Sequence, residues 1–356
     1  MSSQKPKTIL YIYPGLKSTF IEKDIRLLSL NYQVKEYSFN TSNKKMLLWE
    51  LLKQKTHIIW SLWNTSIFLI KFGGYWSLIP VMFARIFGKK AIIITGGTDC
   101  VDFPEIGYGN FNNKPLAMFT QLSFLWANHI IALHQNMILY DYVYQPGINK
   151  QQGLKAFIPN LKTPFSIAYN GYDADFWKKT TTKEKATFIT VAIGLGETRR
   201  RILKGIDIIL EVAVLMPESS FIIIGTDEKE FPTHPSNVIL KPKANSADLI
   251  HHYSKAQFYL QLSMSEGFPN SLCEAMLCEC VPVVSNVASM PFIVGNSGFV
   301  LKNKDTNLLK TLLQEALESD TETLGQMARK RIADNFTEEE RSRQLFEAIE
   351  LTLKGE

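Results

Sequence analysis

Two glutamates, Glu266 and Glu274, lie eight positions apart in the segment SEGFPNSLCEAM, residues 265–276. Carboxylates can exchange protons with a substrate or accept hydrogen bonds from its hydroxyl groups. The two glutamates enclose a turn of sequence Gly-Phe-Pro-Asn-Ser. Their spacing therefore indicates a ligand site at this turn.

The turn between the glutamates has the features of a helix start. Gly267 permits a tight turn and Pro269 suits the first position of a helix, so we expect a helix to begin near Asn270. The free N–H groups of its first turn, with the Ser271 hydroxyl, would form a phosphate site. A carboxylate at Glu274 would repel a phosphate, so we expect it to turn toward neutral hydroxyls such as those of a ribose.

A glycine-rich turn with basic residues follows an earlier apolar run. Cations in the turn after a strand could neutralise a pyrophosphate group. A run of three arginines is more often a solvated helix face, so we expect at most one or two of them to reach a ligand. The segment is AIGLGETRRRILKG, residues 192–205, with Arg199, Arg200, Arg201 and Lys204.

The elements that must position these residues alternate along the chain. A length of 356 residues predicts two domains. Short apolar runs alternate with helical patterns, which is typical of an α/β fold with doubly wound parallel sheets. The predicted strands begin at Thr8, His57, Lys90, His129 and Phe165, and a second series begins at Thr187, Phe221, Asn237, Phe258 and Val281.

The predicted organisation has four parts. The polar segment KKTTTKEK, residues 178–185, has no periodicity and is a credible linker. Ligands of doubly wound folds bind beyond the carboxyl ends of the strands, so two facing lobes would hold a substrate between them. We assign residues 1–171 to an N-terminal domain, 172–186 to a linker or hinge, 187–335 to a C-terminal domain and 336–356 to a C-terminal helix.

The composition excludes few classes of protein. A hydrophobic share of 46% and a charged share of 21% are typical of a soluble globular protein. The net charge of +5 is compatible with anionic ligands or a membrane surface and is too small to require nucleic acid, so we expect no nucleic-acid partner. The four cysteines lack paired spacing and the N-terminal apolar run is short, which favours a cytoplasmic location.

Three cysteines, Cys273, Cys278 and Cys280, crowd into one apolar segment. Thiols at this spacing could be imagined as metal ligands, but a fourth ligand at the spacing of a zinc finger is missing. We therefore interpret them as small core residues.

The least polar region runs from Ile58 to Gly88. Polar residues and prolines interrupt it before the ~20 apolar residues that a membrane-spanning helix needs. We favour a buried strand followed by a core helix. A second interpretation leaves its aromatic residues partly exposed, on a face that rests on a bilayer or grips a lipid-linked substrate. These aromatics are Trp60, Trp63, Phe68, Phe72, Tyr75 and Trp76.

Taken together, the motifs resemble family-4 glycosyltransferases of the GT-B fold. The resemblance rests on the Glu-x7-Glu frame, the AM...VPVV sequence at residues 275–284, the Lys204-Gly205 pair and the NGYD sequence at residues 170–173. It covers most of the chain and is strongest from about residue 187 to residue 300. It implies two Rossmann-like lobes, an acceptor-binding lobe and a nucleotide-sugar-binding lobe, with the active site in the cleft between them.

The resemblance implies a role for each donor-side residue. Glu266 would be catalytic and would face the donor sugar near its anomeric carbon, while Glu274 would bind the nucleotide ribose. Lys204 and Arg199 would bind the diphosphate. The backbone of Gly267, Phe268, Pro269, Asn270 and Ser271 would complete the phosphate site.

The resemblance also implies an acceptor side in the N-terminal domain. The loop PGLKSTF, with Gly15 and Lys17, resembles the family's glycine-containing acceptor loop. The segment TGGTD, with Gly97 and Asp99, resembles a segment that often reads His-Gly-Thr-Asp, so a glycine stands at position 96 where a histidine is common. His134 could substitute for that histidine or could be a structural hydrogen bonder.

Two further positions bear on metal binding and on a helix end. Asp173 and Asp175 match the Asp-x-Asp string that binds a metal ion in other glycosyltransferases, but we interpret this string as a hinge beside the Asn170-Gly171 turn. No metal and no cofactor are expected, because the nucleotide sugar is a substrate. Glu279 occupies a position that is often glycine, which makes the helix end unusual.

The expected function is retaining transfer of a sugar from a UDP- or GDP-linked donor to a saccharide or lipid-linked saccharide, as in cell-surface polysaccharide synthesis. Peripheral contact with the inner face of a membrane would fit such an acceptor. The alternatives are a GT-B sugar-nucleotide epimerase and a catalytically silent sugar-nucleotide binding protein. A dinucleotide-dependent oxidoreductase fits poorly, because GLGETR at Gly194 lacks the third glycine of that fingerprint.

Overall fold

The computed structural model describes residues 7–148 and 150–355, and these residues form two compact units. Unit 1 contains residues 7–140, 152–169 and 338–355, and unit 2 contains the described residues of 141–151 and residues 170–337. The sequence analysis assigned 141–151 to the N-terminal domain and set 336–356 apart as a separate helix. In the structure the first segment groups with unit 2, where the Lys304 amide donates to the Tyr144 carbonyl at 2.8 Å.

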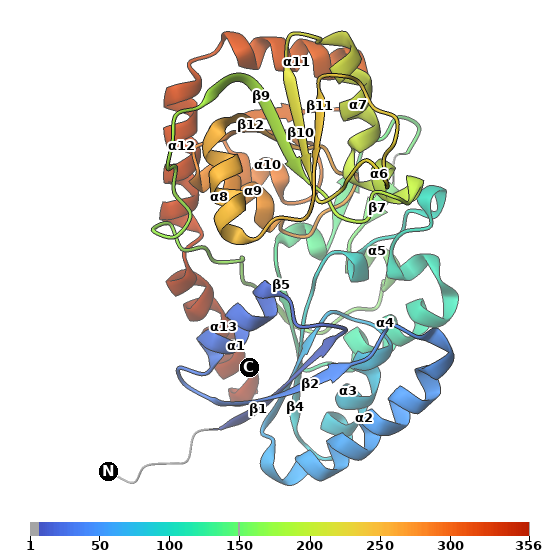
Figure 1. Ribbon diagram of the computed structural model, residues 1–356. Coiled ribbons are helices and arrows are strands. Elements are labelled where there is room, and N and C mark those ends of the chain that lie inside the picture. The colour runs from blue at the N-terminus through green and yellow to red at the C-terminus, as the bar shows by residue number, and fades with distance from the viewer. Residues whose placement is uncertain (1–6, 149, 356) are drawn as a thin grey trace. The chain divides into compact units, whose positions relative to one another are not determined.

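Unit 1 is built on a six-stranded parallel sheet of order β2-β1-β3-β4-β5-β8. The middle strands are fully buried along most of their length, because helices cover the sheet (Figure 1). The strands are β1 (Thr8–Pro14), β2 (Gln33–Phe39), β3 (Ile67–Lys71), β4 (Lys90–Ile94), β5 (His129–Ala132) and β8 (Phe165–Ile167). The helices are α1 (Thr19–Leu28), α2 (Leu47–Ser61), α3 (Tyr75–Ile86), α4 (Lys114–Trp126), α5 (Leu154–Phe157) and α13 (Glu338–Lys354).

Unit 2 is built on a second parallel sheet, of order β11-β10-β9-β12-β13-β14. Numbered within the unit, this is the 3-2-1-4-5-6 order of dinucleotide-binding folds. The strands are β9 (Glu184–Val191), β10 (Ser220–Ile224), β11 (Val238–Lys241), β12 (Ala256–Gln261), β13 (Val281–Ser285) and β14 (Phe299–Leu301). The helices are α6 (Thr198–Lys204), α7 (Ile206–Leu215), α8 (Ser246–Lys255), α9 (Asn270–Leu277), α10 (Met290–Val294), α11 (Thr306–Glu318) and α12 (Thr321–Asn335).

The predicted fold class is confirmed, and one predicted strand is wrong. The apolar run that begins at His57 is the end of helix α2, and the buried strand of this region is β3. The misreading has a physical cause: Ile58 is buried, but Ile59 and Trp60 point to solvent, so the apolar run does not mark a buried segment. Of the aromatics in this region, Trp60 and Trp63 are exposed, whereas Phe68 is buried.

A buried charge network ties the last helix to unit 1. Asp24 on α1 receives two hydrogen bonds from Arg341 on α13, both of 3.1 Å, and one of 3.0 Å from the Lys71 ammonium. Burial disfavours the ionised carboxyl, but the charges of Arg341 and Lys71 outweigh burial and hold the pKa of Asp24 well below its usual range. Arg341 also donates to the Ala168 carbonyl at 2.6 Å. The network therefore joins three distant parts of the chain.

We expect the Arg341→Met substitution to destabilise unit 1 by about 3–5 kcal/mol, because it leaves the Asp24 carboxylate buried without its main partner. Arg26→Met is the matched control, since Arg26 pairs with Glu338 between the same two helices at 2.5 Å but its side chain is 61% exposed. The control should cost less than about 1 kcal/mol. The measurement is denaturant unfolding of both variants, and equal losses of stability would contradict the assignment.

Candidate functional site

The predicted donor residues lie at the point where the strand order of unit 2 reverses. Strands β9 and β12 are neighbours in the middle of the sheet. The strands that follow β9 in the sequence, β10 and β11, lie on one side of this pair, and those that follow β12, β13 and β14, lie on the other side. Lys204 belongs to the segment that follows β9, and Glu266 belongs to the turn that follows β12. Ligands of doubly wound sheets bind at such reversal points, beyond the carboxyl ends of the strands.

Glu266 and Lys204, far apart in the sequence, form an ion pair. The Lys204 Nζ atom lies 2.6 Å from Glu266 Oε1, which also accepts from the Ser263 hydroxyl at 2.8 Å and the Gln261 amide at 3.1 Å. Within residues 7–148 and 150–355, these hydrogen bonds to the carboxylate all fall on Oε1. The second oxygen, Oε2, can therefore accept from a ligand.

Lys204 is placed by a close approach of two backbone segments. Helix α6 ends at Gly205, which has a φ of +69°, and a Cβ atom at this position would lie 2.1 Å from the Leu262 carbonyl oxygen. The Met264 amide donates to the Leu203 carbonyl at 2.8 Å. Glycine is the residue that allows both the left-handed conformation and this contact.

The turn after Glu266 leads into helix α9 as the sequence predicts. The helix begins at Asn270, and Pro269 stands one position earlier than expected, at the N-cap. No side chain of the described residues caps this end, so amides of the first turn can bind an anion. The Asn270 side-chain oxygen accepts from the Tyr172 hydroxyl at 2.8 Å and the Asn170 amide at 3.1 Å, which holds the turn in place.

Two further contacts fix the turn and the second glutamate. The Ser289 hydroxyl donates to the Gly267 carbonyl at 2.7 Å. Glu274 is half-buried on α9, one turn inside the helix. Burial raises the pKa of the nearby Tyr172 hydroxyl most, and Cys273 raises it further. The negative charge of Glu274 is a smaller cause in the same direction. The role of Glu274 in binding a ribose stays a prediction.

A buried polar chain below the site went unpredicted. The Tyr259 hydroxyl lies 2.7 Å from Ser271 Oγ and 3.0 Å from Gln261 Oε1. Gln261 in turn donates to Glu266, so the chain connects the helix start to the glutamate. Burial raises the pKa of Tyr259, which keeps the hydroxyl protonated as a donor. A sign of this polar chain in the sequence is Gln261, a polar residue within the apolar run FYLQLS.

The arginines of α6 differ in their contacts. Arg199 is exposed and lies 3.2 Å from the Glu197 carboxylate. Arg201 donates to the Leu195 carbonyl at 2.6 Å, and its guanidinium stands 4.5 Å from the centre of the Phe231 ring. Arg201 is thus committed to local structure, and the assignment of Arg199 to a diphosphate stays a prediction.

The predicted acceptor-side residues lie in unit 1, and one of them, Asp99, is buried. Its carboxylate accepts the amides of Gly73, Gly96 and Gly97 at 2.8, 2.9 and 3.0 Å. Burial raises the pKa of Asp99, and the amide bonds act in the opposite direction. Asp99 therefore joins the loops after β3 and β4, and its carboxylate is occupied by backbone amides.

The other acceptor-side residues occupy the loops after β1 and β5. Gly15 has a φ of +68° and donates to the Phe39 carbonyl at 2.8 Å, while the Lys17 ammonium lies 2.5 Å from Glu36. The His134 ring accepts from the Asn136 amide at 3.2 Å, and burial lowers the pKa of this histidine to about 4. A neutral, locally bonded ring agrees with the structural alternative for His134.

Position 96 is closed by an aromatic ring. A Cβ atom on Gly96 would lie 2.1 Å from the ring of Phe72, which follows β3. Phe72 adopts a φ of +66°, a conformation that bulky residues rarely adopt, and its amide donates to the Ile94 carbonyl. The space of a histidine at position 96 is therefore filled by Phe72.

The remaining candidate motifs make local contacts or are buried. The Asp173 side chain accepts the amides of Asp175 and Phe176 at 2.9 and 3.0 Å and closes a local turn. The four cysteines are free and buried. In the part of the chain that the structure describes, no cluster of three histidine, cysteine or acidic residues could hold a metal ion.

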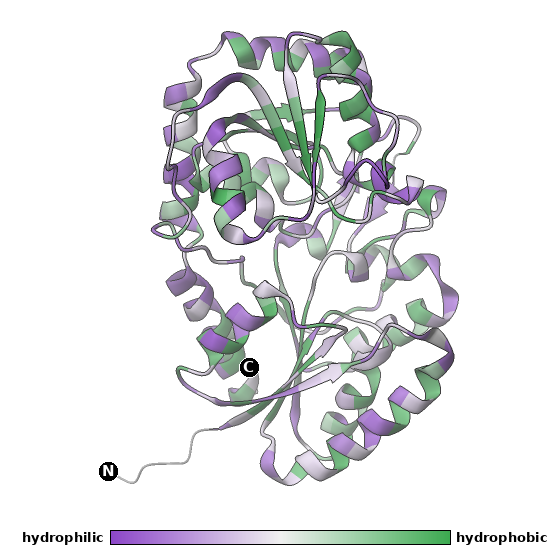
Figure 2. Cartoon of the chain, in the orientation of Figure 1, coloured by the Kyte–Doolittle hydropathy of each residue, from purple (hydrophilic) through white to green (hydrophobic). Residues whose placement is uncertain are grey.

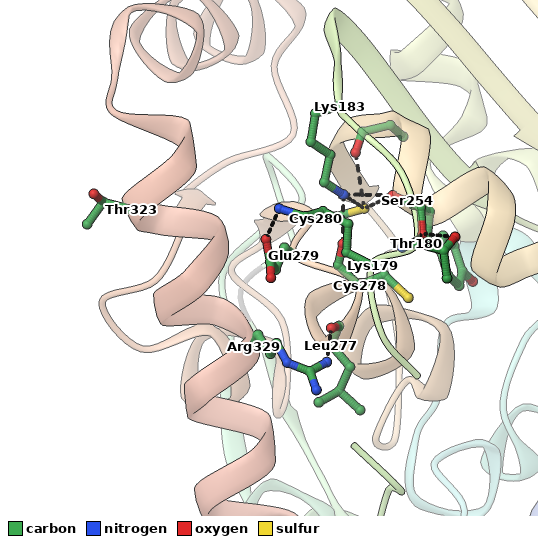
Figure 3. Close-up of polar contacts among 12 residues, drawn as sticks. Lys179, Thr180, Lys183, Ser254, Leu277, Cys278, Glu279, Cys280, Thr323 and Arg329 are labelled. Atoms are coloured by element: carbon green, nitrogen blue, oxygen red, sulfur yellow. Dashed lines mark hydrogen bonds and ion pairs between the residues drawn. The ribbon is translucent and has the colours of Figure 1, made fainter. Parts of the chain in front are cut away.

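The predicted linker is anchored to unit 2. Figure 3 shows the Lys183 ammonium directed at Cys280 and the backbone around it, where it donates to the Tyr253 and Cys278 carbonyls at 2.7 Å. A cavity of about 570 Å³ lies beside this anchor, between the linker and the amino-terminal ends of the strands. It lies at the opposite edge of the sheet from the donor residues. Its lining includes Lys179, Lys183, Lys185, Gln257, Glu279 and Thr321.

We expect Gly205→Ala to cost about 1–3 kcal/mol in stability, because the added methyl group meets the Leu262 carbonyl at a left-handed backbone position. Gly196→Ala is the matched control in the same segment, since nothing lies within 4 Å of a Cβ atom there. Thermal unfolding of both variants checks the prediction. A control as damaging as the Gly205 variant would contradict it.

The chain was compared with known families and proteins. Residues 173–335 match the family described as glycosyl transferases group 1. The O-antigen chain mannosyltransferase B of Escherichia coli is 34% identical over 74 residues, a match that spans 21% of this chain and about a fifth, 19%, of that protein. A second relative, from Campylobacter jejuni subsp. jejuni serotype O:2, is 23% identical over 280 residues, 70% of each chain. It is N,N'-diacetylbacillosaminyl-diphospho-undecaprenol alpha-1,3-N-acetylgalactosaminyltransferase.

Solved structures share the fold over nearly the whole chain. Sucrose-phosphate synthase from Thermosynechococcus elongatus superimposes with a TM-score of 0.75 at 12% identity, over 98% of this chain and 100% of that one. Anabaena HepE, solved in complex with UDP and glucose, gives a TM-score of 0.72 at 13% identity. The superposition covers 97% of this chain and 99% of that one. Residues 173–335 are thus similar to the glycosyl transferases group 1, and the two parallel six-stranded sheets of the chain match the GT-B fold of these solved structures.

Proposed function

We propose that this protein transfers a sugar from a nucleotide-sugar donor to a saccharide or lipid-linked saccharide, with retention of the anomeric configuration. The observation that carries the proposal is the Lys204–Glu266 ion pair beside the start of α9, at the reversal point of the unit 2 sheet. A cation, an uncapped helix start and a carboxylate at one place suit a ligand that joins a diphosphate to a sugar.

The diphosphate is bound by positive charge. Without ligand, the Lys204 ammonium is partnered by Glu266 at 2.6 Å. A diphosphate offers Lys204 a more highly charged partner, while the first amides of α9 bind a second phosphate oxygen. Arg199, exposed in the same segment, adds a further cation. We propose on this basis that transfer needs neither a metal ion nor another cofactor.

Glu266 acts on the sugar. Its Oε1 is held by Ser263 and Gln261, so the carboxylate keeps its orientation when Lys204 turns to the phosphate. Oε2 then accepts from a sugar hydroxyl and offsets the positive charge that develops on the ring. Glu274, one turn into α9, accepts from the ribose hydroxyls.

The reaction balances without a protein nucleophile. The bond between the anomeric carbon and the diphosphate oxygen breaks, and a bond to the acceptor oxygen forms on the same face. The acceptor proton passes to the departing phosphate oxygen, whose charge Lys204 and the α9 amides stabilise.

The substrate classes rest on the relatives. Anabaena HepE was solved with UDP, which supports a UDP-linked donor. The Campylobacter relative is named for an undecaprenol diphosphate acceptor, which supports a lipid-linked saccharide here. The four buried free cysteines support a cytosolic setting, at the inner face of a membrane.

We expect Glu266→Gln to lower kcat by about 10²–10³-fold, because the amide oxygen can still accept from Ser263 and Gln261, but the charge is lost and the NH2 group cannot accept from the sugar hydroxyl. Glu218→Gln, an exposed glutamate of the same unit, is the control and should keep full activity. The assay is sugar transfer from a panel of nucleotide sugars. Undiminished transfer by the Glu266 variant would refute its role.

Nucleotide binding tests the donor class separately from turnover. UDP should stabilise the protein against heat more than GDP or ADP, by about 2.7 kcal/mol at a concentration 100-fold above Kd. Lys204→Met should lose most of this shift, and a chelator should leave both the shift and the transfer unchanged. Binding without transfer would favour a silent binding protein, and release of an epimer without acceptor would favour an epimerase.

A further inference from the structure

Helix α2 buries two polar side chains. Glu50 and Gln54, one turn apart, are buried at 7% and 0% exposure. Gln54 donates to the Trp76 carbonyl at 2.8 Å, and Glu50 accepts from Lys53 at 3.0 Å. A helix on the surface of a globular protein normally buries its apolar stripe instead.

The opposite side of the helix carries large apolar residues in water. Leu48, Leu52, Ile59 and Trp63 are spaced by four, seven and four positions, so they form one stripe along α2 and the turn that follows it. Figure 2 shows hydrophobic and hydrophilic residues side by side along this helix. We define the α2 face as Leu48, Trp49, Leu52, Ile59, Trp60 and Trp63, which are 77%, 52%, 54%, 42%, 83% and 90% exposed.

The charge around the α2 face has one sign. Lys45, Lys53 and Lys55 are exposed beside it. Glu50 is the sole acidic residue of the sequence from position 41 to 64, and it is buried. The outer surface of this segment therefore carries large apolar residues, with the polar Thr56 and His57 among them and lysines at the borders.

We propose that the α2 face docks this protein on an anionic membrane surface. Tryptophan and leucine on one side of a helix, with lysines at the border, suit the boundary between acyl chains and anionic headgroups. With 15 residues, α2 is about 22 Å long and lies in the plane of the interface. None of the helices that the structure describes is long and apolar enough to cross a membrane.

A membrane explains the α2 face better than a second protein does. Three tryptophans prefer the interfacial region of a bilayer, where the ring is in an apolar layer and the indole N–H in a polar one. Lysines are depleted at the centres of protein interfaces, but they are attracted to anionic lipids. The docking rests on the α2 face alone and is independent of the proposed sugar transfer.

The test is co-sedimentation of the full chain with vesicles. Vesicles of phosphatidylcholine with about 30% phosphatidylglycerol should bind the protein, and pure phosphatidylcholine vesicles should bind it several-fold less. The double variant Trp60→Ser/Trp63→Ser should lose binding by about tenfold or more. Phe176→Ser, which removes a 50% exposed aromatic from unit 2, is the matched control and should bind as the wild type does.

Two further variants test how much the lysines beside the α2 face contribute to vesicle binding. Lys45→Glu/Lys55→Glu should abolish the preference for anionic vesicles, whereas Lys178→Glu, an exposed lysine of unit 2, should keep it. Unfolding curves of all variants should match the wild type, because the substituted side chains are exposed.

Three results would overturn the proposal. The first is that the wild type fails to bind anionic vesicles. The second is that the tryptophan variant binds them as well as the wild type does. The third is that the protein does not bind vesicles but forms dimers in solution, which the tryptophan variant abolishes. The last result would assign the α2 face to a second copy of the chain. Nucleotide stabilisation and sugar transfer in detergent would be unaffected by any of them, so a failed docking test leaves the proposed function standing.

Discussion

The predicted donor site of this protein depends on one close contact between two loops. Parallel strands β9 and β12 end at the same edge of their sheet, and the backbone at Gly205 touches the Leu262 carbonyl. That contact brings a lysine and a glutamate, 62 positions apart, within 2.6 Å of each other. A side chain at position 205 would separate the loops, so the chemistry of unit 2 depends on a residue that has no side chain.

Much of unit 2 could be predicted from the sequence, because the local and long-range signals agree there. Apolar runs marked the buried strands, and the Gly-Phe-Pro-Asn turn marked the start of α9. The polar chain through Tyr259 and Gln261 could not be predicted in the same way. Its members belong to apolar runs, and their hydrogen bonds form only when β12 lies beside α9.

Unit 1 was harder to predict, because its polar and apolar residues stand in unexpected places. The run from His57 suggested a buried strand, yet Ile59 and Trp60 face water on α2, while Ile58 is buried. Asp99 suggested a ligand contact, yet it is buried under three backbone amides. Arg341 lies in the charged sequence EEERSRQ, which gives no local sign of burial, yet it is 2% exposed and bonds Asp24. Its burial depends on a partner 317 positions away in the sequence.

The contact between Phe72 and Gly96 also constrains how this chain can change over generations. A histidine at position 96 requires the Phe72 ring to move, since the first added carbon would overlap that ring. A smaller residue at position 72 would open this space and would also remove a bulky side chain from a left-handed backbone position. The effects of substitutions at positions 72 and 96 on stability are therefore expected to be non-additive, because the two residues share one space.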